Sequence, residues 1–450
     1  MASLERLKEF AQPFIRLLPD RRQHRLGEAF LRGLLSDLDR KSTEPIAENA
    51  GMYRRPLQRF IGDSQWDHRP LLGELNEQVR LELGDPNGIF VIDPSSFPKK
   101  GTHSVGVARQ WCGHLGKVDN CQVGVFLGYK TNKGHTLIDE RLYVPREWAR
   151  DKARRLECGV PKELRFRTAQ QLALEMLRER RGLPHGWITA DDEFGRSGPF
   201  RRKLRQMGER YVLDVPGGTR VRDLRAPAPV RKNKRGRAPK VRFVSASAWK
   251  DAVPAGMWKR VHIRDGTTGP MVVWAARTWV QTKTKGKNSP EAEWLVVTRT
   301  DSKTPEIRYH LSSAAEDVSL EELVHVANAR YWIEDCFQRA KGEIGLDHYE
   351  VRSWAGWHHH MTLCMAALWF LVLEQRHLNE KTPAMTVQQS AEVIGEILRD
   401  PAVDLRQLAY KITLRLQRTE QSRIQHWKKF RRIPPTWTQA RAMHISSAAQ

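Results

Sequence analysis

The stretch GIFVIDP, residues 88–94, decides the fold of this chain. Its apolar residues 89–92 form a short continuous run that begins after Gly88 and stops at Asp93. An uninterrupted apolar run of this length, with turn-forming residues at both ends, is typical of a strand buried in the centre of a sheet. The sequence therefore predicts that Asp93 directly follows a central strand, although an Asp before a proline can also be only a turn residue.

A second short strand that ends in acids is predicted at GWITADDEFG, residues 186–195. Asp191, Asp192 and Glu193 follow its apolar residues, and any of the three could instead be a helix N-cap. A carboxylate at the end of a central strand has a fixed backbone and points toward the edge of the sheet. If the two strands are adjacent, their terminal carboxylates come together there.

A third acid is predicted on a helix. Apolar residues recur at helical spacing over residues 320–340, and at roughly 100° per residue Arg330, Glu334 and Lys341 fall within about 40° of one another. Phe337 lies in the same sector, so this face is expected to point inward. An inward glutamate between two cations is costly unless metal or phosphate compensates it. The alternatives for Glu334 are a solvated helix face or an ion pair with Arg330.

Asp93, Asp191 and Glu334 together are the candidate catalytic and metal-binding residues. Hard divalent cations prefer oxygen ligands and keep some of their waters, so three carboxylates on a basic scaffold suit two Mg²⁺ or Mn²⁺ ions. Two such ions, about 3.5–4 Å apart, would activate an attacking oxygen and stabilise a leaving one. The residues therefore predict phosphodiester chemistry.

The pattern of apolar residues divides the chain into five regions and predicts an α+β fold. Helical spacing dominates residues 1–86, strands precede a helix in residues 87–204, and strands separated by Gly, Pro and Lys-rich turns fill residues 205–315. Helical spacing returns in residues 316–376, and residues 377–450 are expected to form a basic helical C-terminal region.

Two basic segments are candidate DNA-binding elements. Residues 44–61 have the size of a helix-turn-helix with Arg54, Arg55 and Arg59 on the second helix, but an ordinary helical hairpin with solvated arginines fits equally. Residues 231–242 contain seven Lys or Arg and no acid, as in a loop that binds phosphates, or one that is merely solvated. The candidate contacts in this loop are Arg231, Lys232, Lys234, Arg235, Arg237 and Lys240.

The composition favours a folded protein that binds nucleic acid. The 450 residues are 40% hydrophobic, which excludes a disordered chain, and carry a formal net charge of +24, which attracts polyanions. The N-terminus lacks a signal-peptide pattern, and the longest apolar run, residues 361–373, is shorter than the roughly 20 residues that span a bilayer. We therefore expect a cytoplasmic, nucleoid-associated protein that does not interact with membranes.

The cysteines and histidines give no metal motif of their own. The five cysteines are scattered and never spaced as CxxC, which argues against a zinc finger and a disulfide framework. His358, His359 and His360 are consecutive on a predicted helix, so they point in different directions and cannot all bind one ion. Asp139 and Glu140 could supplement the acid cluster or form a structural salt bridge.

Three segments together resemble bacterial insertion-sequence transposases of the DDE class, which have a ribonuclease H-like catalytic core. The first-Asp block of that family is similar to VIDPSSFPKKGTHSVGVARQWCGHLGKVDNCQVGV, residues 91–125. The second-Asp block is similar to WITADDEFG, in which the acid after Ala precedes two residues, an aromatic and Gly; this selects Asp191. The Glu block is similar to RYWIEDCFQRAKGEIGLDHYEVRSW, residues 330–354. The likeness spans most of residues 25–375.

The resemblance implies a ribonuclease H-like mixed-sheet core with a β-rich insertion before the Glu helix. The spacing fits, because 97 residues lie between Asp93 and Asp191 and 142 between Asp191 and Glu334. The resemblance also implies that Arg330 and Lys341 contact DNA phosphates near the cleaved end. The chain departs from the family pattern at Ala327, where many relatives carry Tyr.

The implied function is that of a DNA transposase. Such an enzyme cleaves an insertion sequence at its terminal inverted repeats and joins the 3′-hydroxyl to target DNA, as a homodimer in a synaptic complex. Two alternatives share the same residues: a metal-dependent endonuclease without strand transfer, and a transposase-derived DNA-binding regulator. The presence of all three acids favours an active enzyme.

Overall fold

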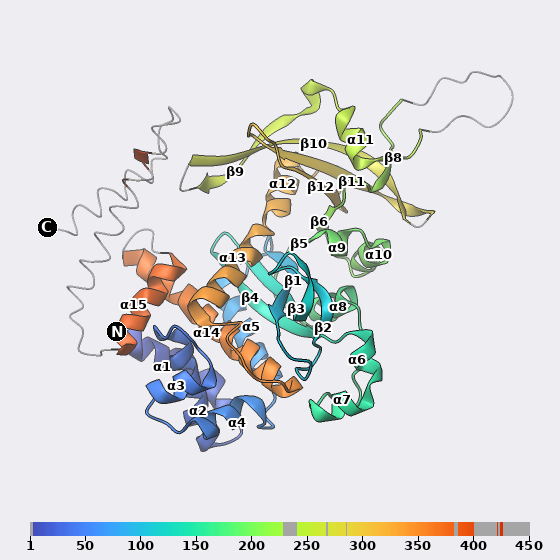
Figure 1. Cartoon of the computed structure of the whole chain (residues 1–450). Coiled ribbons are helices and arrows are strands. Elements are labelled where there is room, and N and C mark those ends of the chain that lie inside the picture. The colour runs from blue at the N-terminus through green and yellow to red at the C-terminus, as the bar shows by residue number, and fades with distance from the viewer. Residues whose placement is uncertain are drawn as a thin grey trace, which may run out of the picture. The chain divides into compact units, whose positions relative to one another are not determined.

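The chain forms two compact units, each described separately (Figure 1). The computed structural model describes residues 3–227, 241–266, 269–284, 286–381, 386–399, 421, 424 and 425. Unit 1 consists of Met1–Gly84, Pro94–Leu183 and Trp332–Gln450, and unit 2 consists of Asp85–Asp93 and Pro184–Tyr331. The chain therefore passes from one unit to the other directly after Asp93 and again directly after Tyr331.

Unit 1 is mainly helical. Its N-terminal helices are α1 (Ser3–Arg16), α2 (Arg21–Leu35), α3 (Thr43–Asn49), α4 (Arg54–Gly62) and α5 (Arg69–Leu83). The later ones are α6 (Arg146–Arg150), α7 (Lys152–Glu157), α8 (Ala169–Glu179), α13 (Tyr331–Arg339), the π-helical η2 (Ala340–Ile344), α14 (Trp354–Lys381) and α15 (Val387–Arg399).

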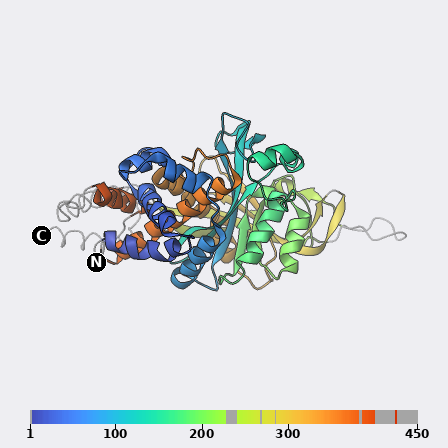
Figure 2. The ribbon, with the colours of Figure 1, turned by 90° about the horizontal axis from the view of Figure 1, so that it is seen from below.

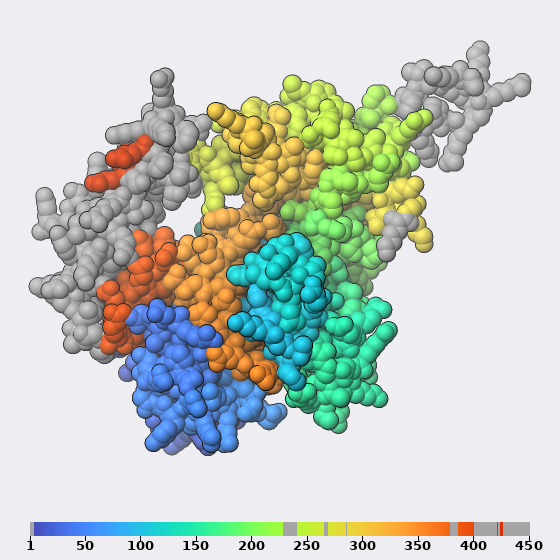
Figure 3. All heavy atoms as spheres, viewed as in Figure 1, coloured from blue at the N-terminus to red at the C-terminus, as the bar shows by residue number. Residues whose placement is uncertain are grey.

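The long helix α14 is the centre of unit 1. Its residues from Trp357 to Phe370 are all buried, and a helix that is buried on every side must be enclosed by other elements. The helices α1, α2, α4 and α5 pack against it, and Figures 1 and 2 show them gathered around it. Helix α15 lies against α1 and α2, as the space-filling view in Figure 3 also shows. The apolar run at residues 361–373, in a region where helical spacing was predicted, lies within α14.

Three antiparallel strands complete unit 1. They are β2 (Ala108–Cys112), β3 (Lys117–Thr131) and β4 (Gly134–Tyr143), paired in chain order. Helices α5 and α14 pack on β4, and α8 packs on β3 and β4. Residues 137–140 of β4 are completely buried, which follows from this cover by helices.

Three short parallel strands begin unit 2. The first part of β1 (Ile89–Pro98) pairs with β5 (Trp187–Ala190), which pairs in turn with β6 (Tyr211–Val215). Parallel strands covered on both faces consist of continuous apolar runs, and residues 89–92 and 187–190 are fully buried, as predicted. The short helices α9 (Asp192–Gly195) and α10 (Gly198–Gln206) connect β5 to β6.

A β-rich segment follows β6, as predicted for an insertion after the second Asp. Its strands are β7 (Arg220–Asp223), β8 (Val244–Ser245), β9 (Lys259–Gly266), β10 (Gly269–Thr284), β11 (Lys287–Thr300) and β12 (Ile307–Ser312). They pair antiparallel, and β12 joins them to β6. The helical elements of this segment are α11 (Ala246–Asp251), the 3-10 turn η1 (Ala255–Met257) and α12 (Leu320–Asn328). The α+β class with a mixed sheet is confirmed.

The helix predicted over residues 320–340 is wrong in one respect, because it is interrupted. Helix α12 ends at Asn328, α13 begins at Tyr331, and Arg330 lies in the turn between them. Lys341 lies in η2, whose π-helical winding differs from roughly 100° per residue. A single helical wheel therefore does not apply to this segment. Most of the predicted basic C-terminal region lies outside the described residues.

None of the helices among the described residues is long and apolar enough to cross a membrane.

Candidate active site

Two predicted acids are adjacent where the parallel pairing of β1 with β5 stops. Asp191 directly follows β5, as predicted, but β1 continues through Asp93 to Pro98, so the prediction that the strand ends before Asp93 is wrong. Strand β1 pairs with β5 in parallel from Ile89↔Trp187 to Ile92↔Ala190, so Asp93 and Asp191 are the next residues in register. Neighbouring strands lie about 4.8 Å apart, and residues aligned across parallel strands point to the same face. The structure therefore brings Asp93 and Asp191 side by side at one edge of the sheet in unit 2.

Asp191 is the strand-end acid of its block, and it also caps a helix. Its Oδ1 accepts hydrogen bonds from the backbone N–H groups of Glu193 at 3.0 Å and Phe194 at 3.3 Å, at the start of α9. Both bonds go to the same oxygen, and Oδ2 has no hydrogen bond within the described part of the chain. Burial, together with the charge of Glu193, raises the pKa of Asp191 to about 6. The carboxylate is thus short of compensating positive charge.

The neighbouring acids of the block occupy different positions. Asp192 forms an exposed ion pair with Arg196, one helical turn further on. Glu193 is exposed and lies within α9. Asp191 is therefore both the residue that follows the strand and the N-cap of the helix, so the two interpretations of the block apply to the same acid.

The glycine that ends this block is required by a close backbone contact. A Cβ atom built on Gly195 would lie 1.8 Å from the carbonyl oxygen of Asp214 on β6 and 3.1 Å from Cβ of Leu213. The short helix α9 can therefore lie directly on β6 with glycine alone at this position. This contact gives the aromatic-Gly ending of the block a physical reason.

A third acid in this row, Asp214 on β6, was not predicted from the sequence. Strand β6 pairs with β5 in parallel up to Ala190↔Leu213, so Asp214 continues the row formed by Asp93 and Asp191. Its Oδ1 is 2.7 Å from Nδ1 of His310 on β12. Burial alone would raise the pKa of Asp214, but His310 and Arg330 hold it below its ordinary value. The apolar run YVLDV with a single acid is the sequence signal that could have indicated it.

Arg330 connects two of the three aspartates. Its Nη1 is 3.4 Å from Oδ1 of Asp93, and its Nε is 3.4 Å from Oδ2 of Asp214. The side chains of all three residues are less than a fifth exposed. The guanidinium group therefore provides a positive charge within the row of acids in unit 2.

Glu334 and Lys341 belong to unit 1. Glu334 is exposed in the first turn of α13, whereas Ile333, Cys336 and Phe337 form the buried side of that helix. The prediction that Glu334 shares an inward face with Phe337 is therefore wrong. Phe337 belongs to the buried side of the helix, and Glu334 lies just outside it. Lys341 Nζ lies 5.3 Å from the ring centroid of Phe97. That Glu334 meets the two aspartates remains a prediction.

The candidate DNA-binding arginines of the N-terminal region are on the surface. Helices α3 and α4 flank Gly51, whose φ of 61° lies in the left-handed region. Arg54, Arg55 and Arg59 are all exposed on α4, and Arg54 forms an ion pair with Glu44 of α3. The loop residues Arg231, Lys232, Lys234, Arg235, Arg237 and Lys240 lie outside the described residues.

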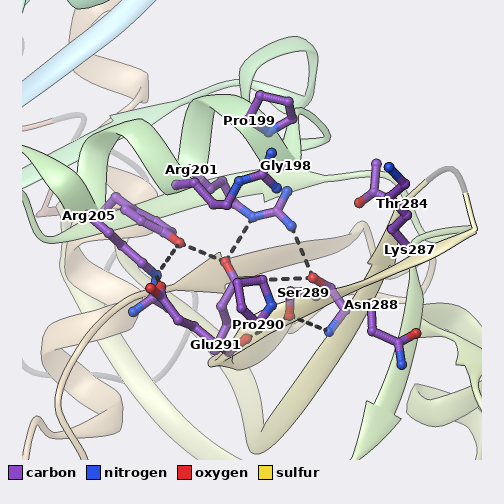
Figure 4. Close-up of a pocket in the computed structure, with 14 residues that line it drawn as sticks. Gly198, Pro199, Arg201, Arg205, Thr284, Lys287, Asn288, Ser289, Pro290 and Glu291 are labelled. Carbon is purple, nitrogen blue, oxygen red and sulfur yellow. Dashed lines mark hydrogen bonds and ion pairs between the residues drawn. The ribbon is translucent and has the colours of Figure 1, made fainter.

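A pocket of about 240 Å³ in unit 2 is built around buried ion pairs (Figure 4). Arg201 on α10 donates to Glu293 on β11 at 2.8 Å, and the hydroxyl of Tyr211 donates to the same carboxylate at 2.7 Å. Arg205 pairs with Glu291 at 2.8 Å. Each of these charges has an internal partner, so the arginines attach α10 to the β-rich segment and are not available to bind an external anion.

The family of the chain follows from a sequence comparison. Residues 13–270 match the sequence profile of a family described as "DDE superfamily endonuclease". The match covers more than half of the chain, so this protein belongs to the DDE superfamily of endonucleases. It includes Asp93 and Asp191 and ends before Glu334.

One curated relative and one solved structure add to this comparison. The probable transposase for insertion sequence element IS701 of Microchaete diplosiphon is 30% identical over 218 residues, which are 46% of this chain and 53% of that protein. The chain thus spans about half the length of this relative. A structural match to the NurA nuclease from Sulfolobus solfataricus covers 74% of this chain and 92% of the nuclease chain at 10% sequence identity. Its TM-score is 0.25, and no conclusion is drawn from a match this weak.

Gly195→Ala should destabilise the protein, because the added Cβ collides with the backbone of β6. Overpacking of this kind costs about 1–3 kcal/mol or more of unfolding free energy, measured by chemical denaturation. Gly73→Ala is the matched control, since a Cβ on that exposed residue of α5 meets nothing within 4 Å. The control should be neutral or more stable by up to about 1 kcal/mol. Equal loss of stability in both variants would contradict the close contact at Gly195.

Proposed function

We propose that this protein is a DNA transposase that cleaves the ends of an insertion sequence and joins the freed 3′-hydroxyl to target DNA. The observation that carries the proposal is the pair Asp93 and Asp191 at aligned positions of two adjacent parallel strands, in a chain of the DDE superfamily. The relative of Microchaete diplosiphon, named as a probable transposase, favours transposition over other nuclease functions.

The donor atoms of the proposed site suit hard divalent cations. Carboxylate oxygens are the ligands preferred by Mg²⁺ and Mn²⁺, and Asp93 and Asp191 present two carboxylates on one face. Oδ1 of Asp191 is held by two backbone N–H groups, while the raised pKa of this carboxyl reports a deficit of positive charge. Two ions bound by Asp93, Asp191 and Glu334 would activate the attacking oxygen and stabilise the leaving one.

Glu334 is proposed as the third carboxylate. It follows Arg330 by four residues, and Arg330 contacts Asp93, so chain connectivity limits how far Glu334 can lie from that contact. Its exposure leaves the carboxylate accessible to ions and to DNA. The resemblance of residues 330–354 to the Glu block of insertion-sequence transposases supports this role.

The other charged residues of the row would position the acids and the DNA. Arg330 holds Asp93 and Asp214, and His310 fixes Asp214 from the β-rich segment. We propose that Arg330 transfers its contacts from these carboxylates to a phosphate beside the cleaved bond when DNA binds, and that Lys341 contacts a neighbouring phosphate. Asp214 would then be a positioning residue for Arg330.

Asp93→Asn or Asp191→Asn should abolish cleavage while leaving DNA affinity unchanged. Loss of a metal-binding carboxylate removes several kcal/mol of transition-state stabilisation, so the cleavage rate should fall at least about 10³-fold. The measurement is incubation with Mg²⁺ and the DNA that flanks the encoding gene, with each cut mapped to the nucleotide.

Asp192→Asn provides the matched control for these variants. Asp192 is adjacent to Asp191, but its carboxylate pairs with Arg196 at the surface. This variant should cleave at the wild-type rate. Wild-type cleavage by Asp93→Asn, or equal loss in Asp192→Asn and Asp191→Asn, would show that the metal site has been placed wrongly.

Pre-cleaved transposon ends and a target plasmid separate transposition from simple nuclease activity. A transposase should join the 3′-hydroxyl of the supplied end to the plasmid, giving a branched or linear product that contains both DNAs. An endonuclease without strand transfer would cut but give no joined product. A DNA-binding regulator would bind the ends and neither cut nor join them.

DNA is the proposed partner of the helical hairpin α3–α4. Arg55→Ala and Arg59→Ala should each weaken binding to end DNA and reduce the salt dependence of log Kobs by about 1, because each loses roughly one phosphate contact. Arg80→Ala is the control, since this exposed arginine is already paired with Glu77. If the slope of log Kobs against log salt concentration in the Arg55 and Arg59 variants equals that of the wild type, this surface is not the DNA interface.

Three further proposals follow from a transposase function. The ends of the element are expected to be brought together by a homodimer in a synaptic complex on terminal inverted repeats. The basic residues 231–240 would bind the phosphates of end or target DNA. Since the substrate is chromosomal DNA, the proposed place of action is the nucleoid in the cytoplasm.

A further inference from the structure

A second group of metal-ligating side chains lies within unit 1 and shares no residue with the row of aspartates in unit 2. His68 precedes α5, Glu140 is on β4, and His358 is on α14. One potential ligand atom from each residue lies within 4.8 Å of the other two. Helices α5 and α14 both pack on β4, so this packing holds the three residues together.

Two polar atoms of this group are buried without a partner. The side chain of Glu140 is fully buried and that of His358 is 2% exposed. Glu140 Oε1 and His358 Nδ1 are 2.7 Å apart, but within the described part of the chain Glu140 Oε2 and His358 Nε2 have no hydrogen-bond partner. Leaving such groups unsatisfied costs about 1–3 kcal/mol each, so a simple Glu–His hydrogen bond does not account for the arrangement.

The neighbouring arginines do not form ion pairs with Glu140. Arg141 and Arg180 both bind the adjacent, fully buried Asp139, at 2.5 Å and 2.6 Å. Arg141 also pairs with Glu179. Glu140 is therefore a second buried carboxylate beside one whose charge is already compensated.

The two histidine rings lie against each other, and a neutral imidazole binds a metal ion through a ring nitrogen. The two rings are stacked with centroids 4.5 Å apart and planes 16° apart, and His68 is still 16% exposed. An ion can therefore reach the group from the side of His68.

We propose that His68, Glu140 and His358 form a binding site for a zinc ion, separate from the carboxylate site of catalysis. Two imidazoles and one carboxylate are a donor set that zinc takes in proteins, usually with a water as the fourth ligand. Mg²⁺ prefers oxygen ligands alone. The two histidines therefore favour a different class of metal from the one that the aspartates of unit 2 would bind. Bound there, the ion connects α5, β4 and α14 and satisfies the buried carboxylate.

The remaining buried histidines of α14 have other partners, which makes His358 distinct. His359 stacks on Trp66 at 3.6 Å and lies within hydrogen-bond distance of the carbonyls of Ile61 and Trp66. His360 lies 3.2 Å from the carbonyl of Gly345. The sequence expectation that the three consecutive histidines do not bind one ion agrees with these contacts, and the additional ligands come from other elements.

Elemental analysis and thermal unfolding of the full-length protein test this proposal. Protein purified without chelator should contain one zinc per chain. Removal of the metal should lower Tm, and Zn²⁺ should restore it. Co²⁺ in place of zinc should give visible absorption bands of a nitrogen- and oxygen-ligated site. Wild-type protein that holds no zinc and shows no shift in Tm on addition of Zn²⁺ would overturn the proposal.

Variants assign the metal to these residues. Two variants remove a proposed ligand: His68→Gln, near the surface, and Glu140→Gln, which keeps the shape of the side chain. Each should weaken Zn²⁺ binding by more than about 100-fold, because losing only a residue that hydrogen-bonds to a ligand costs roughly 10–100-fold. His103→Gln, an exposed histidine of the same unit, and the double variant Asp93→Asn/Asp191→Asn should bind Zn²⁺ as the wild type does. Zinc binding that survives in His68→Gln and Glu140→Gln, or disappears in the double variant, would contradict the assignment.

Discussion

Parallel pairing of β1, β5 and β6 in one register is the constraint on which the proposed chemistry depends. The pairing aligns Asp93, Asp191 and Asp214 as consecutive members of a row, and a slip of one residue would turn a carboxylate to the opposite face of the sheet. The contact of Gly195 with the backbone of Asp214 lets α9, whose N-cap is Asp191, lie directly on β6. Local packing and the position of the acids are thus two consequences of the same backbone arrangement.

The electrostatic environment assigns different roles to the aspartates in the row. Asp214 has His310 and Arg330 as partners, and its pKa lies below the ordinary value despite burial. Asp191 is compensated mainly by two backbone N–H groups, and its pKa lies near 6. A carboxylate whose charge is already balanced suits the positioning of an arginine, whereas one that lacks balance suits the binding of a cation. The same distinction between Asp139, which is paired with arginines, and Glu140 supports the zinc site in unit 1.

The sequence predicted the features that depend on neighbouring residues. The apolar runs at residues 89–92, 187–190 and 361–373 reveal buried elements by composition alone. The first two runs indicated Asp93 and Asp191, although β1 continues through Asp93 to Pro98. Asp214 was missed because its role depends on the pairing of β6 with β5 and on His310, which is distant in the chain. The wheel that placed Glu334 inward failed because Glu334 lies outside the buried stripe of α13, which is formed by Ile333, Cys336 and Phe337. The partnership of Glu140 and His358 required tertiary packing that no local pattern encodes.

The most direct test of the central claim is the anomalous scattering of Mn²⁺ in crystals of the protein bound to its end DNA. We expect peaks at coordination distance, about 2.1 Å, from the carboxylates of Asp93 and Asp191, with Glu334 ligating the same pair of ions. Strong peaks elsewhere with none at Asp93 and Asp191, or ions bound there without Glu334, would contradict the account of the active site.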